Sequence, residues 1–80
     1  MNIYKRAFSV KCPNNDESIW YELELQADVM VMVEAIAAVT DGFTEGYHED
    51  IADILHEQLG HKQIIRAHHH GVSIETRRGF

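Results

Sequence analysis

The sequence predicts a small α+β domain in which two helices cover one face of an antiparallel sheet. Three observations lead to this prediction. Apolar and polar residues alternate over residues 3–12 and 18–27, apolar residues recur at helical spacing over residues 44–59, and β-forming residues return after residue 63. The expected order is β-β-α-α-β, with a further strand if the last segment is a hairpin. Residues 1–80 are expected to form one domain, because a chain of this length has room for a single core.

The first two segments each have one apolar side, as half-buried strands do. These sides are formed by Tyr4, Phe8, Val10 and Cys12 in the first segment and by Ile19, Tyr21, Leu23, Leu25 and Ala27 in the second. Residues 13–16 read Pro-Asn-Asn-Asp, and such residues favour a turn because proline presets φ and asparagine tolerates left-handed backbone. An antiparallel hairpin follows.

A first helix is expected over residues 29–39, with Asp28 as its N-cap and Gly42 as its stop. Alternating valines at its start also suit a strand, whereas the alanines that follow favour the helix. The segment is apolar nearly all round, so part of its surface needs a partner. We therefore expect either self-association as a homodimer, through Met30, Met32 and Val33, or docking of a partner on this segment.

A second helix is expected over residues 44–59, capped by Thr44 and stopped by Gly60. Its buried stripe would consist of Tyr47, Ile51, Ile54, Leu55 and either Gln58 or Leu59. Residues 63–77 then form either one long strand or a hairpin that turns at His69-His70-Gly71. Glycine at the turn favours the hairpin. Residues 77–80 are expected to fray.

Charge is strongly segregated along the chain. All seven basic residues lie outside residues 12–61 and twelve of the thirteen carboxylates lie inside, which gives +3, −12 and +3 for the three blocks and −6 in total. An acidic helix face can steer a basic partner toward the protein. The expected partner is therefore a protein with a basic surface, bound by Glu45, Glu49, Asp50, Asp53 and Glu57.

No nucleophile motif or phosphate-binding loop occurs, and a chain this short has little room for a cleft. The sequence therefore predicts a protein that is not an enzyme and needs no cofactor. Small, acidic, motif-free chains are common among accessory proteins of phages and mobile elements. By this analogy of size and charge, the expected function is protein binding, as an inhibitor of a host nuclease or CRISPR-type protein.

The alternative is a small metal- or nucleic-acid-binding regulator that uses some of the six histidines. His56 and His61 are five residues apart, so they miss the four-residue spacing of the zincin helix. The candidate metal ligands are Asp53, His56, His61, His68 and His70. Nucleic acid would instead use Trp20 with the basic residues Lys5, Lys11, Arg66, Arg77 and Arg78. The net charge of −6 argues against nucleic acid.

The location expected from the sequence is the cytoplasm. No apolar run reaches the length of a membrane span, and the first residues lack the apolar core of a signal peptide. Cys12 is the only cysteine, so the chain has no internal disulfide and no cysteine-based zinc site.

Overall fold

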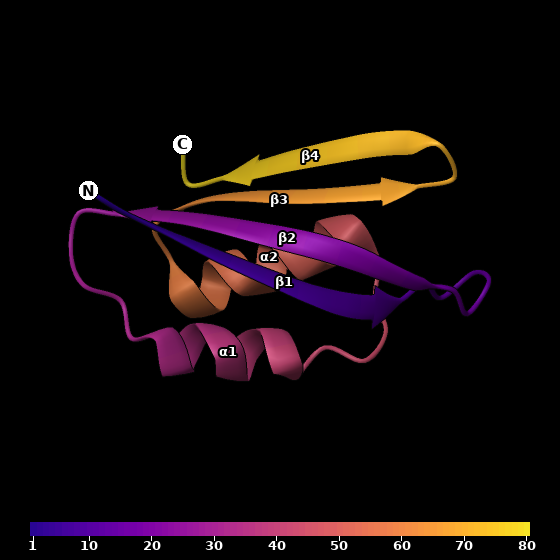
Figure 1. The fold of residues 1–80 in the computed structure, drawn as a ribbon, viewed down its shortest axis with the longest axis horizontal. Coiled ribbons are helices and arrows are strands. Elements are labelled where there is room, and N and C mark those ends of the chain that lie inside the picture. The colour runs from indigo at the N-terminus through magenta and orange to yellow at the C-terminus, as the bar shows by residue number, and fades with distance from the viewer.

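The computed structural model describes residues 1–80 and has the predicted α+β architecture. The elements are β1 (Asn2–Lys11), β2 (Ser18–Ala27), α1 (Val33–Asp41), α2 (His48–Leu59), β3 (Lys62–His69) and β4 (Val72–Arg78). The strands form one antiparallel sheet in the order β1-β2-β3-β4 (Figure 1). Helix α1 packs on β1, and α2 packs on β3 and β4. Neither helix has the length and hydropathy needed to cross a membrane.

The alternating apolar residues of β1 and β2 form the core beneath the helices, as predicted. The buried strand residues are Phe8, Val10, Cys12, Ile19, Tyr21, Leu23, Leu25 and Ala27. Helix α2 adds Ile51, Ala52 and Leu55 to this core. The predicted stripe was wrong at Tyr47 and Ile54, which are about half exposed. The small Ala52 is fully buried in the core instead.

The first helix begins at Val33, four residues later than predicted, and Met32 is its N-cap without a side-chain bond. Asp28 therefore does not cap it. The preceding valines, Val29 and Val31, lie outside the helix in a segment that begins with a bend. The backbone N–H of Val31 donates to the hydroxyl of Tyr4 at 2.9 Å, which ties this segment to β1.

The second helix begins at His48, so Thr44 does not cap it. The segment before it pairs with the end of β1: Lys11 N–H donates to the Thr44 carbonyl, and Gly46 N–H donates to the Lys11 carbonyl, both at 3.1 Å. The hairpin between β3 and β4 is confirmed. The expected fraying of residues 77–80 was wrong for the first two, because both lie in β4 and Arg78 binds Asp53 at 2.8 Å.

Gln63 joins α2 to β3. It is fully buried, and its Nε2 donates to the carbonyls of Leu55 at 3.0 Å and Gly60 at 2.7 Å. Gln63 therefore links the last turn of α2, and the glycine that follows it, to the start of β3.

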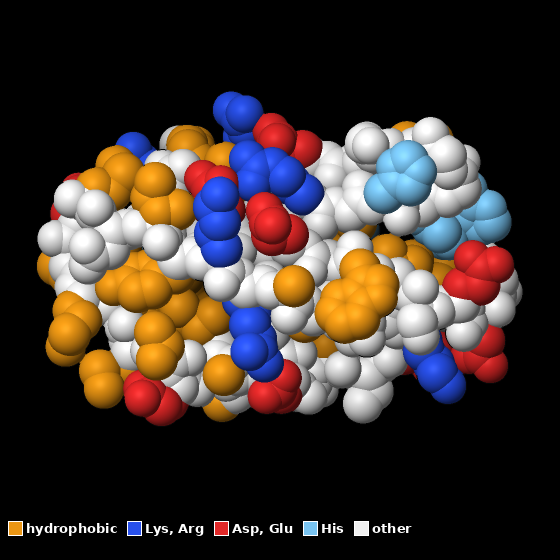
Figure 2. Space-filling view, in the orientation of Figure 1, with side chains coloured by type: hydrophobic (Ala, Val, Ile, Leu, Met, Phe, Trp, Pro, Cys, Tyr) orange, Lys and Arg blue, Asp and Glu red, His pale blue; other side chains and the backbone are white.

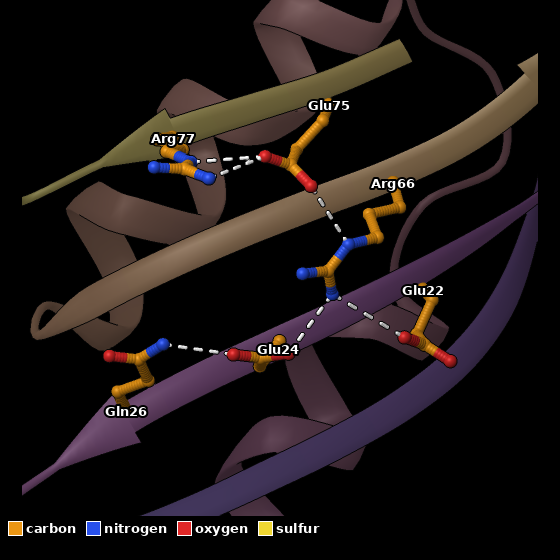
Figure 3. Close-up of polar contacts among 6 residues, drawn as sticks. All are labelled: Glu22, Glu24, Gln26, Arg66, Glu75 and Arg77. Carbon is orange, nitrogen blue, oxygen red and sulfur yellow. Dashed lines mark hydrogen bonds and ion pairs between the residues drawn. The ribbon is translucent and has the colours of Figure 1, made fainter. Parts of the chain in front are cut away.

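The open face of the sheet carries an ion-pair network centred on Arg66 (Figure 3). Arg66 on β3 reaches Glu24 of β2 and Glu75 of β4, both at 3.0 Å, and Arg77 donates to Glu75 at 2.8 Å. Acids from the middle block thus pair with bases from the outer blocks, and Figure 2 shows the two signs of charge intermixed over the sheet. The folded surface is less polarised than the sequence.

An apolar patch lies at the end of the molecule where β2 leads into α1 (Figure 2). It consists of Val29, Met30, Met32 and Val33, which are all more than half exposed. Self-association through this patch stays a prediction.

We expect Gln63→Leu to lower the free energy of unfolding by about 1–3 kcal/mol, because the buried carbonyl of Leu55 and the partly buried carbonyl of Gly60 lose their donor while the side-chain volume is nearly kept. Urea unfolding followed by circular dichroism measures this change. Gln58→Leu, on the exposed side of α2, is the control and should change stability by less than about 0.5 kcal/mol. Equal stability of Gln63→Leu and the wild type would contradict the role of Gln63.

We expect Met30→Glu with Met32→Glu to weaken any dimer, because two charges would be buried in its interface. Sedimentation velocity over a range of concentrations measures the association. Val72→Glu is a matched control, since Val72 is 57% exposed, close to the 56% of Met32, and lies at the other end of the molecule. A wild-type protein that stays monomeric at all concentrations would refute the prediction.

Candidate functional site

A cavity of about 440 Å³ lies at the end of the molecule where both hairpin turns meet the start of α2. Figure 1 shows these three segments converging from distant parts of the chain. The cavity is lined by Cys12, Asn14, Asn15, Ile19, Tyr21, Tyr47, His48, Ala67, His69, His70 and Ile74. This volume is within the range of small-molecule sites.

One row of residues across the sheet forms the floor of this cavity. Tyr21 lies opposite Ala67, and Ala67 lies opposite Ile74. The rings of Tyr21 and His48 are 5.4 Å apart and tilted by 50°, so a strand residue and a helix residue meet in the cavity wall. At the rim, the Tyr47 hydroxyl donates to Asn14 Oδ1 at 2.8 Å, and the amide nitrogen of Asn14 makes no hydrogen bond within the chain. The cavity therefore combines flat aromatic surfaces with an amide donor.

The cavity wall contains a buried histidine, His48, whose pKa is shifted from its ordinary value. Both ring nitrogens are buried, and neither makes a hydrogen bond of good geometry. Burial lowers the pKa of His48 below its ordinary value of 6.5, and the opposing effects of the Ile65 backbone and Glu49 do not cancel this shift. The imidazole is therefore neutral at pH 7, with a lone pair that can accept a proton.

Cys12 places a thiol in the same cavity. The residue is only 6% exposed, and its backbone is held by hydrogen bonds with Glu17 at 2.8 Å and Asp16 at 3.0 Å. Burial, and secondarily Cys12, raises the pKa of the neighbouring Tyr21 hydroxyl. In the sequence Cys12 is simply the last member of an apolar strand face. Its position directly before a turn was the one available sign that it could line a site.

The structure separates the histidines that the sequence put forward as ligands of one metal. His56 and His61 lie at one end of β3, around a second cavity. His68 and His70 lie at the other end, about 20–25 Å away along an eight-residue strand. Asp53 is bound by Arg78, and His68 Nδ1 is 3.1 Å from the Ser73 hydroxyl. His68 and His70 therefore do not share a site with His56 and His61, and a metal site at Asp53, His56 and His61 stays a prediction.

The five carboxylates expected to bind a basic partner are all exposed. Two of them differ from the expectation in detail. Asp53 pairs with Arg78, and Glu45 precedes α2 in a segment bridged to Lys11 of β1. Binding of a basic protein by this surface stays a prediction.

No protein-family model matches this sequence, and no curated protein matches it. The fold is similar to that in the crystal structure of the archaeosine synthase QueF-Like in its apo form. The TM-score is 0.76 at 17% sequence identity, over 99% of this chain and 93% of the other. At this identity the likeness shows a shared fold.

This likeness corrects two expectations from the sequence. The chain was expected to be a non-enzymatic inhibitor from a phage or mobile element, and not an enzyme. Its fold is instead the fold of an enzyme, shared over almost the whole chain. The earlier expectation relied on size and charge, which describe a surface, and on the absence of short motifs, which does not exclude a site assembled from distant segments.

We expect the NMR titration of His48 in the folded protein to have its midpoint below 6.5. Between pH 6.5 and the lower pKa of folded His48, this histidine is protonated in the unfolded chain but neutral in the folded protein. The free energy of unfolding therefore falls as the pH decreases from 6.5 to the folded pKa. His48→Gln removes this contribution and identifies the resonance. A midpoint at or above that of the same histidine in urea would show that the ring is not buried as described.

Proposed function

We propose that this protein is an enzyme whose active site is the cavity between the two hairpin turns and the start of α2. The observation that carries this proposal is the presence of a thiol, Cys12, and a buried, neutral imidazole, His48, in the wall of one cavity. The similarity to an archaeosine synthase supports an enzymatic activity. The cytoplasmic location expected from the sequence stays a prediction.

The proposed substrate is a single nucleobase-like heterocycle, free or as a nucleoside. A planar ring can stack on the tyrosine and histidine rings of the wall, as bases stack on aromatic side chains. The amide of Asn14 at the rim can hydrogen-bond to the edge of such a ring. The net charge of −6 opposes the approach of a long polyanion, which favours a small ligand over a polynucleotide.

The proposed chemistry is attack by the Cys12 sulfur on an electrophilic carbon of the bound ring. A thiol becomes a strong nucleophile when a base accepts its proton, and neutral His48 supplies such a base. In this step the S–H proton passes to the imidazole while a C–S bond forms. The proton on His48 is then available to the ring atom that gains the electron pair.

We expect the alkylation of Cys12 by iodoacetamide to slow by about a hundredfold or more in His48→Gln, the lower end of what a positioned base contributes. Intact-mass spectrometry measures the rate, and Cys12→Ser gives the unlabelled baseline. His68→Gln, on an exposed histidine beyond the cavity, is the matched control and should react like the wild type.

The same labelling assay tests the substrate class. Free bases, nucleosides and short RNA are added in turn, and a ligand seated in the cavity should protect Cys12 from alkylation. Protection by a base or nucleoside supports the proposal, whereas protection by RNA alone contradicts the small-ligand part of it. If no ligand protects Cys12 and His48→Gln reacts at the wild-type rate, the proposed active site is wrong.

A further inference from the structure

Three side chains with metal-binding atoms meet where the two hairpin turns approach each other. They are Glu17 at the start of β2 and the neighbouring pair His69 and His70 at the end of β3. One ligand atom from each lies within 4.8 Å of those of the other two. Figure 2 shows the histidines gathered at this end of the molecule beside an acidic side chain. Neither Glu17 nor His69 was among the candidates from the sequence.

Strand alternation explains why Glu17 and His69 point the same way. Glu17 is two residues before the inward-facing Ile19, and His69 is two residues after Ala67, on the cavity floor. Both side chains therefore continue the helix-covered face of the sheet to a point beyond the helices. His69 Nε2 lies 3.6 Å from Glu17 Oε2, and this buried nitrogen has no hydrogen-bond partner.

The turn itself adds the third side chain. His70 has φ 52° and Gly71 has φ 76°, the left-handed pair that a two-residue hairpin turn requires. Asparagine or glycine is the usual residue at the first of these positions, so histidine is accepted there at some conformational cost. The backbone places the His70 ring 4.1 Å from that of His69, and Asn15 lies 3.1 Å from His70 Nε2.

We propose that Glu17, His69 and His70 bind a divalent transition-metal ion, with zinc as the best match. Two imidazoles and one carboxylate form a ligand set that zinc accepts, and they leave a fourth position open. Zinc bonds of about 2.0–2.1 Å put tetrahedral ligand atoms about 3.3 Å apart. The 3.6 Å pair is already close to this spacing, and the third ligand needs to move by at most about 1.5 Å at an exposed turn.

The open position would adjoin the cavity, because His69 and His70 also line it. A ligand in the cavity can then reach the metal with one oxygen or nitrogen atom. The metal site does not depend on the proposed enzymatic activity, since it is defined by binding of the ion alone.

Titration calorimetry of the metal-free protein with zinc tests this site, and Co²⁺ absorption reports the coordination geometry. We expect one ion per chain with micromolar affinity or tighter. Glu17→Gln and His69→Ala should each weaken binding at least about tenfold, the loss already caused by removing an outer-sphere partner. Glu17 is exposed, so its substitution is expected to leave the fold intact, which thermal unfolding verifies.

Two controls show where the ion binds. His68→Ala removes the adjacent histidine of the same strand, which lies with Ser73 outside the cluster, and should bind zinc like the wild type. The double variant His56→Ala with His61→Ala removes the histidines at the opposite end of β3 and should also bind normally. The proposal is overturned if binding is no tighter than millimolar, if Glu17→Gln and His69→Ala leave it unchanged, or if either control loses it.

Discussion

The packing of α2 on the centre of the sheet holds this molecule together. Ile51, Ala52 and Leu55 are at most 1% exposed and share one core with the fully buried Leu23 and Leu25 of β2. Each large side chain buried in this way contributes about 1.5–3 kcal/mol relative to exposure. The same contact determines where the ends of α2 lie. One end is linked to β3 by Gln63, and the other brings His48 to the cavity.

The two helices cover only one face of the sheet. The other face is exposed to solvent and carries paired charged side chains. Arg66 takes part in the pairing of three adjacent strands through carboxylates of β2 and β4 (Figure 3). Hydrogen bonds from Gln26 and then Arg66 lower the pKa of Glu24, so this carboxylate stays charged well below neutral pH. The antiparallel register thus brings together charges that the sequence keeps in separate blocks, which explains why the charge segregation was a poor guide to function.

Both proposals concern the same end of the molecule because the topology gathers its reactive side chains there. The two hairpins of this antiparallel sheet turn at the same end of the strands, and α2 starts beside these turns (Figure 1). The thiol, the neutral imidazole and the Glu17 cluster therefore come from segments separated by up to about sixty residues in the sequence. The cavity wall has apolar, hydrogen-bonding and titratable groups, the combination that small-molecule sites use.

The sequence alone determined the first hairpin, the order of the elements and the buried faces of the first two strands, because a period of two leaves only one way to face the core. It favoured the second hairpin over one long strand, and the structure decided between them. It misplaced the helix starts, since Val31 bonds to Tyr4 and residues 44–46 pair with β1 through contacts that no local pattern reveals. The sequence showed which residues have metal-binding or reactive side chains, but it did not show which of them lie close together in the folded protein. Whether His70 joins His56 or Glu17 depends on the length of β3 and the meeting of two turns, and only the tertiary structure decides such distances.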